Sequence, residues 1–198
     1  MAFCSLVDRI NERGDGQMNL PNKLTVLRVF MVPFFVFFML MADQFGQWSR
    51  YLALVIFAAA SLTDLLDGKI ARKYNLITNF GKFMDPLADK LLVSAALICF
   101  VSLGRIPCWI VIIIISREFV ISGFRLVAAQ QNIVIAAGMW GKVKTAVTMV
   151  TIIFMIPQFP GSIVHVLEQI LIWLCLALTI VSLCDYLFHN RSVLSGEI

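Results

Sequence analysis

Six long apolar segments constrain this chain more than any other feature of its sequence. They cover residues 24–42, 49–71, 79–103, the stretch from a break at 104–107 to 130, the stretch from a flexible entry at 138–141 to 157, and 163–188. Each reaches or approaches the ~20 residues that a membrane-spanning α-helix needs. Two prolines and a glycine at 157–161 predict a firm turn between the last two segments. Charged residues make up only 14% of the chain, whereas soluble domains carry about 25%. The sequence therefore predicts an all-α integral membrane protein, a six-transmembrane-helix bundle.

The first seventeen residues differ from the rest of the chain. They contain Asp8, Arg9, Glu12, Arg13 and Asp15 without an unbroken apolar core, so a cleaved signal peptide is not expected. Apolar residues at helical spacing allow a short interfacial helix here, and a polar extension ahead of Met18 is the equal alternative. We therefore divide the chain into an N-terminal extension, 1–17, and one membrane domain, 18–198.

Cysteine spacing and net charge argue against three possibilities: a disulfide framework, a zinc site and a nucleic-acid-binding protein. The five cysteines are widely spaced and form no C-x-x-C pair, so neither a disulfide framework nor a zinc site is expected. The net charge of +4 is too small to suggest a nucleic-acid-binding protein. The distribution of the basic residues is more informative than their sum.

Basic residues predict the orientation in the membrane, because cytoplasmic loops are enriched in Lys and Arg. With six spans, both termini share a side with the turns after the second and fourth spans. That side collects Arg9, Arg13, Lys23, Arg28, Lys69, Arg72, Lys73, Lys82, Lys142, Lys144 and Arg191, against Arg50 and Arg105 opposite. We expect a multi-pass protein of the cell membrane with both termini in the cytoplasm.

Four aspartates stand close together on the predicted cytoplasmic side. Asp64 and Asp67 share one face of the second segment, and Asp85 and Asp89 are one turn apart on the third. A short turn makes these helices antiparallel neighbours, so the carboxylates converge. Oxygen ligands without His or Cys favour Mg²⁺, Mn²⁺ or Ca²⁺, and two ions suit phosphoryl transfer. The alternatives are a structural salt-bridge cluster or an ion pathway.

Small residues accompany the first two aspartates. Gly68 and Ala71 lie on the same helix face and leave room for a flat ligand against the backbone, with close helix packing as the alternative. Arg72, one turn beyond Gly68, either pairs with a phosphate or extends to the membrane interface.

The pattern D-x-x-D-G-x-x-A-R-x8-G-x3-D-x3-D, residues 64–89, resembles the signature of the CDP-alcohol phosphatidyltransferase family at every fixed position. Members are six-span membrane enzymes, usually homodimers, with divalent metal at the cytoplasmic face. The resemblance implies transfer of a phosphatidyl group from CDP-diacylglycerol to an alcohol, with release of CMP. It also implies bound Mg²⁺ or Mn²⁺, two ions, and no nucleic-acid partner.

The resemblance assigns roles to the motif residues. Asp64, Asp67, Asp85 and Asp89 would bind metal, and Asp89 would also be the general base for the acceptor hydroxyl. The cytidine nucleotide would be lined by Gly68, Ala71, Arg72 and Gly81. The first span resembles the family as well, which adds Asn22 and Thr25, followed by Arg28, to the nucleotide side. A plain helix N-cap is an equal alternative for Asn22.

The acceptor must be inferred from the fourth and fifth segments. Arg117 lies well inside an apolar run, where an arginine is costly and usually functional, and Arg125 follows two turns later. Lys142 and Lys144 are about 200° apart on a helix, so we expect only one to face the site. We favour Lys142, with Lys144 at lipid headgroups. Three cations, Arg117, Arg125 and Lys142, would suit an acceptor that carries phosphate. The alternative is that Arg117 pairs with Glu118 or an aspartate.

Two further stretches resemble bacterial phosphatidylglycerophosphate synthases: R-E-F-x-I-S-G-x-R at 117–125 and G-K-x-K-T at 141–145. This resemblance implies sn-glycerol 3-phosphate as acceptor and phosphatidylglycerophosphate as product. A cardiolipin or phosphatidylinositol-phosphate synthase is the alternative within the family. A divalent-cation transporter is a remote alternative from another class; it requires polar groups that continue through the membrane.

Overall fold

The computed structural model describes the backbone of residues 20–73, 79–130 and 138–189, and within these ranges the side chains of 24–63, 87–88, 90–125 and 138–189. The extension at 1–17 lies outside the described residues. All regular structure in the described part is helical, which confirms the expected all-α class. The helices are α2 (Leu20–Leu40), α3 (Ala42–Phe45), α4 (Gln47–Lys73), α5 (Asn79–Ser102), α6 (Cys108–Gln130), α7 (Met139–Met155) and α8 (Ser162–His189).

Each of the six apolar segments forms one long helix, with bounds within a few residues of those expected. The one-turn helix α3 is an addition that the sequence pattern did not indicate. The predicted breaks at 104–107 and 157–161 are confirmed as the connections α5–α6 and α7–α8. Gly104 takes a φ of +69°, a left-handed conformation that glycine adopts without steric cost. It therefore allows the chain to reverse after α5.

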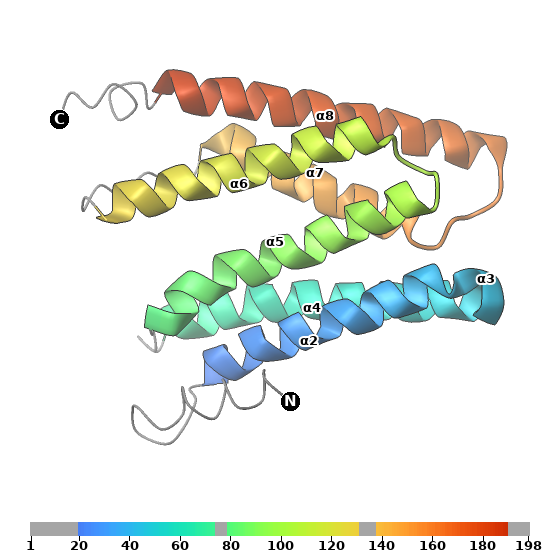
Figure 1. The fold of residues 1–198 in the computed structure, drawn as a ribbon, viewed down its shortest axis with the longest axis horizontal. Helices are drawn as coiled ribbons and strands as arrows, with labels where there is room; N and C mark the ends of the chain where they lie inside the picture. Colours follow the sequence, from blue (N-terminus) through green and yellow to red (C-terminus); the bar gives the residue numbers. More distant parts are fainter. Residues whose placement is uncertain (1–19, 74–78, 131–137, 190–198) are drawn as a thin grey trace.

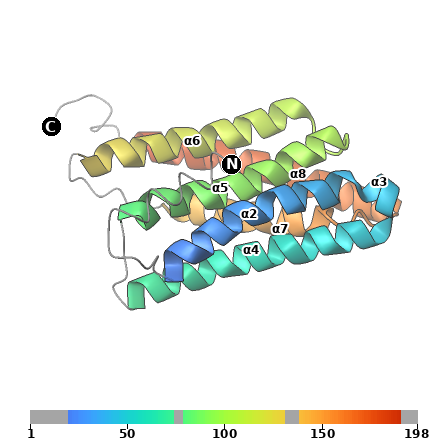
Figure 2. The same cartoon turned by 60° about the horizontal axis from the view of Figure 1, so that its bottom comes forward.

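The six long helices lie side by side and alternate in direction (Figure 1). One end of the bundle holds the start of α5 and the end of α4, and we call it the motif end. The opposite end, with α3 and the α5–α6 connection, is the far end. Figure 2 shows α2 lying across α4 and α5, and α8 packs on α7 and α6. Two three-helix groups thus meet where α5 contacts α6 and α7 and where α4 contacts α7.

The interior is built from apolar residues at helical spacing. On α2 the buried side chains of Val32, Phe35 and Met39 recur every three or four residues, as expected for one face of a helix. Phe35 packs against Phe57 of α4, with ring centroids 5.6 Å apart. The stripe continues toward the motif end as Thr25 and Arg28, so polar side chains extend the buried face of α2 there.

The outer faces of the bundle are also apolar. Large hydrophobic side chains are exposed on every long helix, for example Phe34, Val55, Ile98, Ile112, Val150 and Ile170. Extended apolar surface of this kind indicates contact with a membrane or a partner. Within the described residues, α8 is the one helix that is long and apolar enough by itself to cross a membrane. The other helices are shorter or carry charged residues, so six spans remain a prediction.

Candidate active site

The aspartate motif lies on the last turns of α4 and the first turns of α5. These two helices contact each other and run antiparallel, as the sequence predicted. At 1.5 Å per residue, Asp67 stands about 9 Å before the end of α4, and Asp85 about 9 Å after the start of α5. Asp64 and Asp89 stand about 14 Å and 15 Å from the same ends. The backbone therefore places both pairs at matching depths; their side chains lie outside the described residues.

The residues expected to contact the nucleotide come from the same end of the bundle. Gly68, Ala71 and Arg72 are on α4, and Gly81 is on α5; their side-chain surroundings lie outside the described part, as does the side chain of Asn22 on α2. Thr25 is described and fully buried, as is Arg28 one turn further along α2. Both therefore lie on the buried face of α2.

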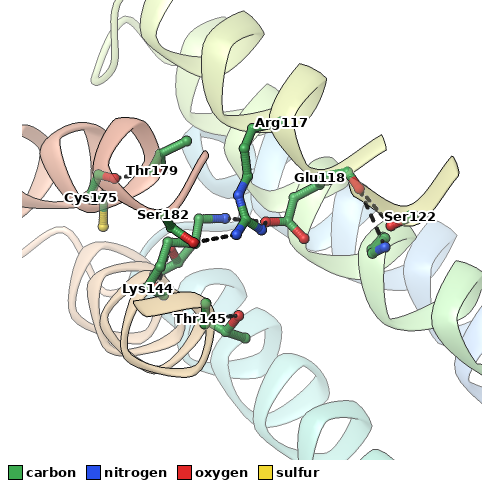
Figure 3. A network of polar contacts seen from close by, with 11 residues as sticks. Arg117, Glu118, Ser122, Lys144, Thr145, Cys175, Thr179 and Ser182 are labelled. Carbon is green, nitrogen blue, oxygen red and sulfur yellow. Dashed lines mark hydrogen bonds and ion pairs between the residues drawn. The ribbon is translucent and has the colours of Figure 1, made fainter. Parts of the chain in front are cut away.

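A buried ionic network joins α6, α7 and α8 (Figure 3). Arg117 Nη1 donates to Glu118 Oε1 at 2.9 Å, and Lys144 Nζ donates to the same oxygen at 2.6 Å. Arg117 Nη2 also donates to the Ser182 hydroxyl on α8. One carboxylate oxygen therefore binds two cations from different helices.

The network is connected to the helix that bears the second half of the motif. Lys90 follows Asp89 on α5, and its Nζ donates to the backbone carbonyl of Glu118 at 3.4 Å. A cavity of about 20 Å³ lies between α5, α6 and α7, and its walls include Lys90, Glu118, Lys144 and Thr148. Glu118 of α6 and Lys144 of α7 thus lie next to α5, one residue beyond the last aspartate of the motif.

The two lysines of α7 take the opposite orientations to those expected. Lys144 is 2% exposed and is directed into the bundle, whereas Lys142 is exposed. The expectation that Lys144 meets lipid headgroups is therefore wrong. Lys144 continues the buried stripe of Thr148 and Thr151, and its ammonium group gains an ion pair that compensates the lost hydration.

Arg117 forms the pair with Glu118 that its sequence position argued against. Neighbouring residues on a helix diverge by about 100°, yet the long arginine side chain folds back to reach the carboxylate. Arg125 occupies a separate place nearer the motif end. Its guanidinium carbon lies 5.9 Å from the ring centroid of Tyr186 on α8, a cation–π distance. Both predicted arginines are described, but no direct contact joins them.

Sequence reasoning missed two members of this network, Ser182 and Lys90. It also missed that Glu118 lies at the centre of the network. A signal existed for Ser182, because the small or polar residues Cys175, Thr179 and Ser182 recur at helical spacing on α8, and all three are buried. Thr151 of α7 faces this stripe, with its hydroxyl 3.2 Å from Cys175 Sγ. No sequence spacing indicates that one carboxylate oxygen would accept from two helices.

A second buried ion pair lies at the far end. Arg105, in the α5–α6 connection, donates to both carboxylate oxygens of Glu168 on α8, at 2.6 Å to Oε1. Glu168 is 1% exposed, and His165 Nδ1 lies 3.8 Å from its Oε2. This pair holds the α5–α6 connection against α8, remote from the aspartate motif.

Comparison with known proteins identifies relatives of the whole helical region. The profile of the CDP-alcohol phosphatidyltransferase family matches residues 18–181. The chain is 41% identical to the CDP-diacylglycerol–glycerol-3-phosphate 3-phosphatidyltransferase of Bacillus subtilis, over 89% of this chain and 97% of the relative. It is 37% identical to a probable phosphatidylglycerophosphate synthase of Mycobacterium tuberculosis (90% and 84%), and 36% identical to a Rickettsia felis protein with the same name as the Bacillus one (85% and 93%).

Proposed function

The chain belongs to the CDP-alcohol phosphatidyltransferase family, and from this premise we propose that it transfers the phosphatidyl group of CDP-diacylglycerol to sn-glycerol 3-phosphate. The products are phosphatidylglycerophosphate and CMP. The names of the Bacillus and Rickettsia relatives support both substrates. One structural observation carries the choice of a phosphorylated acceptor: two buried cations, Arg117 and Lys144, meet at Glu118, whose carboxylate borders a cavity that the motif helix α5 also lines.

The four motif carboxylates would hold the divalent cations, Mg²⁺ or Mn²⁺, two ions in all. Asp64, Asp67, Asp85 and Asp89 offer only hard oxygen donors, which fit these metals, and their helices bring them to matching depths. When bound, the ions would stabilise the negative charge that develops on the donor's phosphates.

In the proposed reaction Asp89 accepts the proton of the acceptor hydroxyl. The freed oxygen attacks the lipid-side phosphorus of CDP-diacylglycerol, and the bond from that phosphorus to the oxygen of the leaving CMP breaks. Gly68, Ala71 and Gly81 would leave the helix backbones open to the cytidine, and Arg72 would pair with a donor phosphate. The first helix would contribute Asn22 and the buried Thr25 to the same nucleotide site.

Basic residues of α6 and α7 would hold the acceptor's phosphate. Arg117 lies between α6, α7 and α8, bound to Glu118 and Ser182, and Arg125 is held over Tyr186 nearer the motif end. Lys144 adds a cation from the interior, and Lys142, exposed one turn before Thr145, would be an outer contact. Guanidinium groups suit this task because they bind phosphate oxygens in pairs.

The protein would span the cell membrane six times, with the motif end on the cytoplasmic side. The exposed apolar side chains on all six long helices support contact with lipid along the whole bundle. The positions of Arg50 and Arg105 at the far end, and of Lys142 and Lys144 near the motif end, agree with the expected orientation. A homodimer is proposed on the family resemblance alone.

An acceptor screen tests the proposal. Purified protein with CDP-diacylglycerol would be offered sn-glycerol 3-phosphate, phosphatidylglycerol or inositol phosphate in turn, with Mg²⁺ or Mn²⁺, while CMP release and the lipid product are measured. We expect turnover with glycerol 3-phosphate. Turnover with one of the other acceptors instead would reassign the enzyme within its family. Metal flux in proteoliposomes without CMP production would favour a transporter.

The base assignment has its own test. Asp89→Asn keeps the size of the side chain but removes its capacity to accept a proton, so we expect CMP release to fall by about a thousandfold. Glu168→Gln is the control, because it makes the same carboxylate-to-amide change at the far end. An Asp89→Asn protein with full activity would contradict the assignment.

A further inference from the structure

We propose that Glu118 is a positioning residue for acceptor binding: it aligns Arg117 and Lys144 on one carboxylate oxygen, so that both cations are already brought together when the acceptor's phosphate arrives. This inference rests on the proposed function, because it assigns Arg117 to the acceptor. It adds a residue that no part of the family signature at 64–89 contains.

The geometry of the network places Glu118 at its centre. Arg117 and Lys144 come from α6 and α7, and both donate to Glu118 Oε1, at 2.9 Å and 2.6 Å. Figure 3 shows the two side chains approaching the carboxylate from different helices. No direct hydrogen bond between two cations is possible, so the shared anion is what brings them together.

Water cannot replace Glu118 as the partner of Lys144. Lys144 is 2% exposed, and the cavity beside it, about 20 Å³, holds about one water molecule. A buried ammonium group requires a counter-ion, and Glu118 is the acidic side chain that pairs with Lys144 in the described part of the chain. Without this carboxylate, two positive charges would face each other across a poorly hydrated space and would move apart.

The surrounding helices fix the position of Glu118 and Arg117. Lys90 of α5 donates to the Glu118 carbonyl, and Ser182 of α8 accepts from Arg117 Nη2. Gly141 of α7 presents no side chain to the guanidinium: a Cβ at this position would lie 3.6 Å from Arg117 Nη2. One terminal nitrogen of Arg117 thus donates to Glu118 and the other to Ser182, which limits the rotation of the guanidinium group.

The charge balance explains why the network favours an anionic ligand. Arg117 and Lys144, the two cations that pair with the carboxylate, carry two positive charges against the one negative charge of Glu118, and Lys90 adds a further ammonium group at its backbone carbonyl. The excess positive charge is stabilised further when a phosphate group binds. Glu118 therefore keeps the cations together without cancelling their attraction for phosphate.

Steady-state kinetics of Glu118→Gln test this role. The amide keeps the shape but removes the charge, so the two cations separate and the KM for sn-glycerol 3-phosphate should rise about tenfold. The kcat and the KM for CDP-diacylglycerol should stay within about twofold of wild type, because neither depends on the acceptor's phosphate. Glu118→Asp keeps the charge on a shorter side chain and should give an intermediate KM.

Glu168→Gln is the matched control, because it removes a buried, arginine-paired carboxylate at the far end. Its acceptor KM should equal that of wild type. An unchanged acceptor KM in Glu118→Gln, or an equal effect on both substrates, would overturn the proposal. If Glu118→Gln does not fold, Glu118→Asp decides: an acceptor KM within about twofold of wild type overturns it.

Assays of the wild-type enzyme distinguish a failure of this inference from a failure of the proposed function. If it does not use glycerol 3-phosphate at all, the proposed function fails, whatever the variants do. Calorimetric binding of inorganic phosphate to the wild type and to Glu118→Gln then tests the positioning role alone. Weaker binding by Glu118→Gln supports it, and equal binding contradicts it.

Discussion

Two carboxylates pair with arginines in this bundle: the partly buried Glu118 in the middle of α6, and the fully buried Glu168 near the start of α8, at the far end of the bundle. Glu168 pairs with Arg105, with His165 at the edge, and is 1% exposed. Glu118 pairs with Arg117 and Lys144, is 18% exposed, and borders a cavity. The Glu168 carboxylate pairs with one arginine, whereas the Glu118 carboxylate pairs with two cations, one positive charge more than it neutralises.

This difference separates a structural pair from a candidate binding site. A balanced buried pair satisfies its own charges and needs no ligand. A cluster with excess charge is more stable when an anion binds, and perturbed charge clusters of this kind concentrate at functional sites. Burial alone does not distinguish the two, because Glu168 is the more buried carboxylate. The following predictions test whether the two clusters behave as differently as their charges suggest.

Removal of divalent metal should have the largest effect, and only on the motif end. Chelation should lower CMP release by about a thousandfold, since the four motif carboxylates would lose the ions that stabilise the donor's phosphates. Added Mg²⁺ or Mn²⁺ should restore activity. The difference in melting temperature between the Glu168→Gln variant and the wild type should be the same with and without metal. Full activity after exhaustive chelation would remove the metal from the proposed reaction.

Arg117→Met should lower kcat/KM for glycerol 3-phosphate by about a hundredfold, because a bidentate phosphate contact is lost. Arg105→Met is the matched change in the far-end cluster. It should leave kcat/KM per folded molecule within about twofold of wild type. Activity measured on protein selected by size-exclusion chromatography checks both. Equal losses in the two variants would mean that both clusters act only through stability.

Glu168→Gln should lower the free energy of unfolding by about 2 kcal/mol, less than the ~3–5 kcal/mol for a fully buried pair, because Arg105 can still reach water. Arg105 is 28% exposed. For a chain of this length the melting temperature should fall by roughly 4–8 °C. Asp43→Asn is the control: Asp43 is 81% exposed and lies 3.7 Å from Arg50, so its loss should leave the melting temperature unchanged.

Lys142→Ala should have the smallest effect, about threefold on the acceptor KM, because the side chain is exposed and its charge is screened. Lys144→Met should raise the same KM about tenfold, since it removes a cation that Glu118 holds. Comparing the two variants tests which of the two lysines contributes more to acceptor binding. A larger effect for Lys142 would favour the orientation first expected from the sequence.

Much of the fold could be predicted because it depends on apolar length. The six long helices and the breaks at 104–107 and 157–161 follow from composition and from Gly and Pro. Helix α3 was missed because four residues, one of them Asp43, carry no periodic signal.

The sequence named the candidate residues of the site but only some of the contacts that they make. The aspartate pattern located the motif end, and the cost of an arginine in an apolar run indicated Arg117. The orientation of Lys144 required the buried stripe that it shares with Thr148 and Thr151, which was present in the sequence as threonines four and seven residues later. The pair between Arg117 and Glu118 depends on side-chain flexibility, which helical angles do not describe.

The shared carboxylate also has a consequence for how the protein is made. Helix α7 is 17 residues long and carries Lys144 on its inner face, so its lysine would be unpaired if the helix entered a lipid bilayer alone. Because α6 precedes α7 in the chain, Glu118 is synthesised first and can receive that charge. We therefore expect the insertion of α7 to depend on α6, and a fragment that lacks α6 to leave α7 outside the membrane.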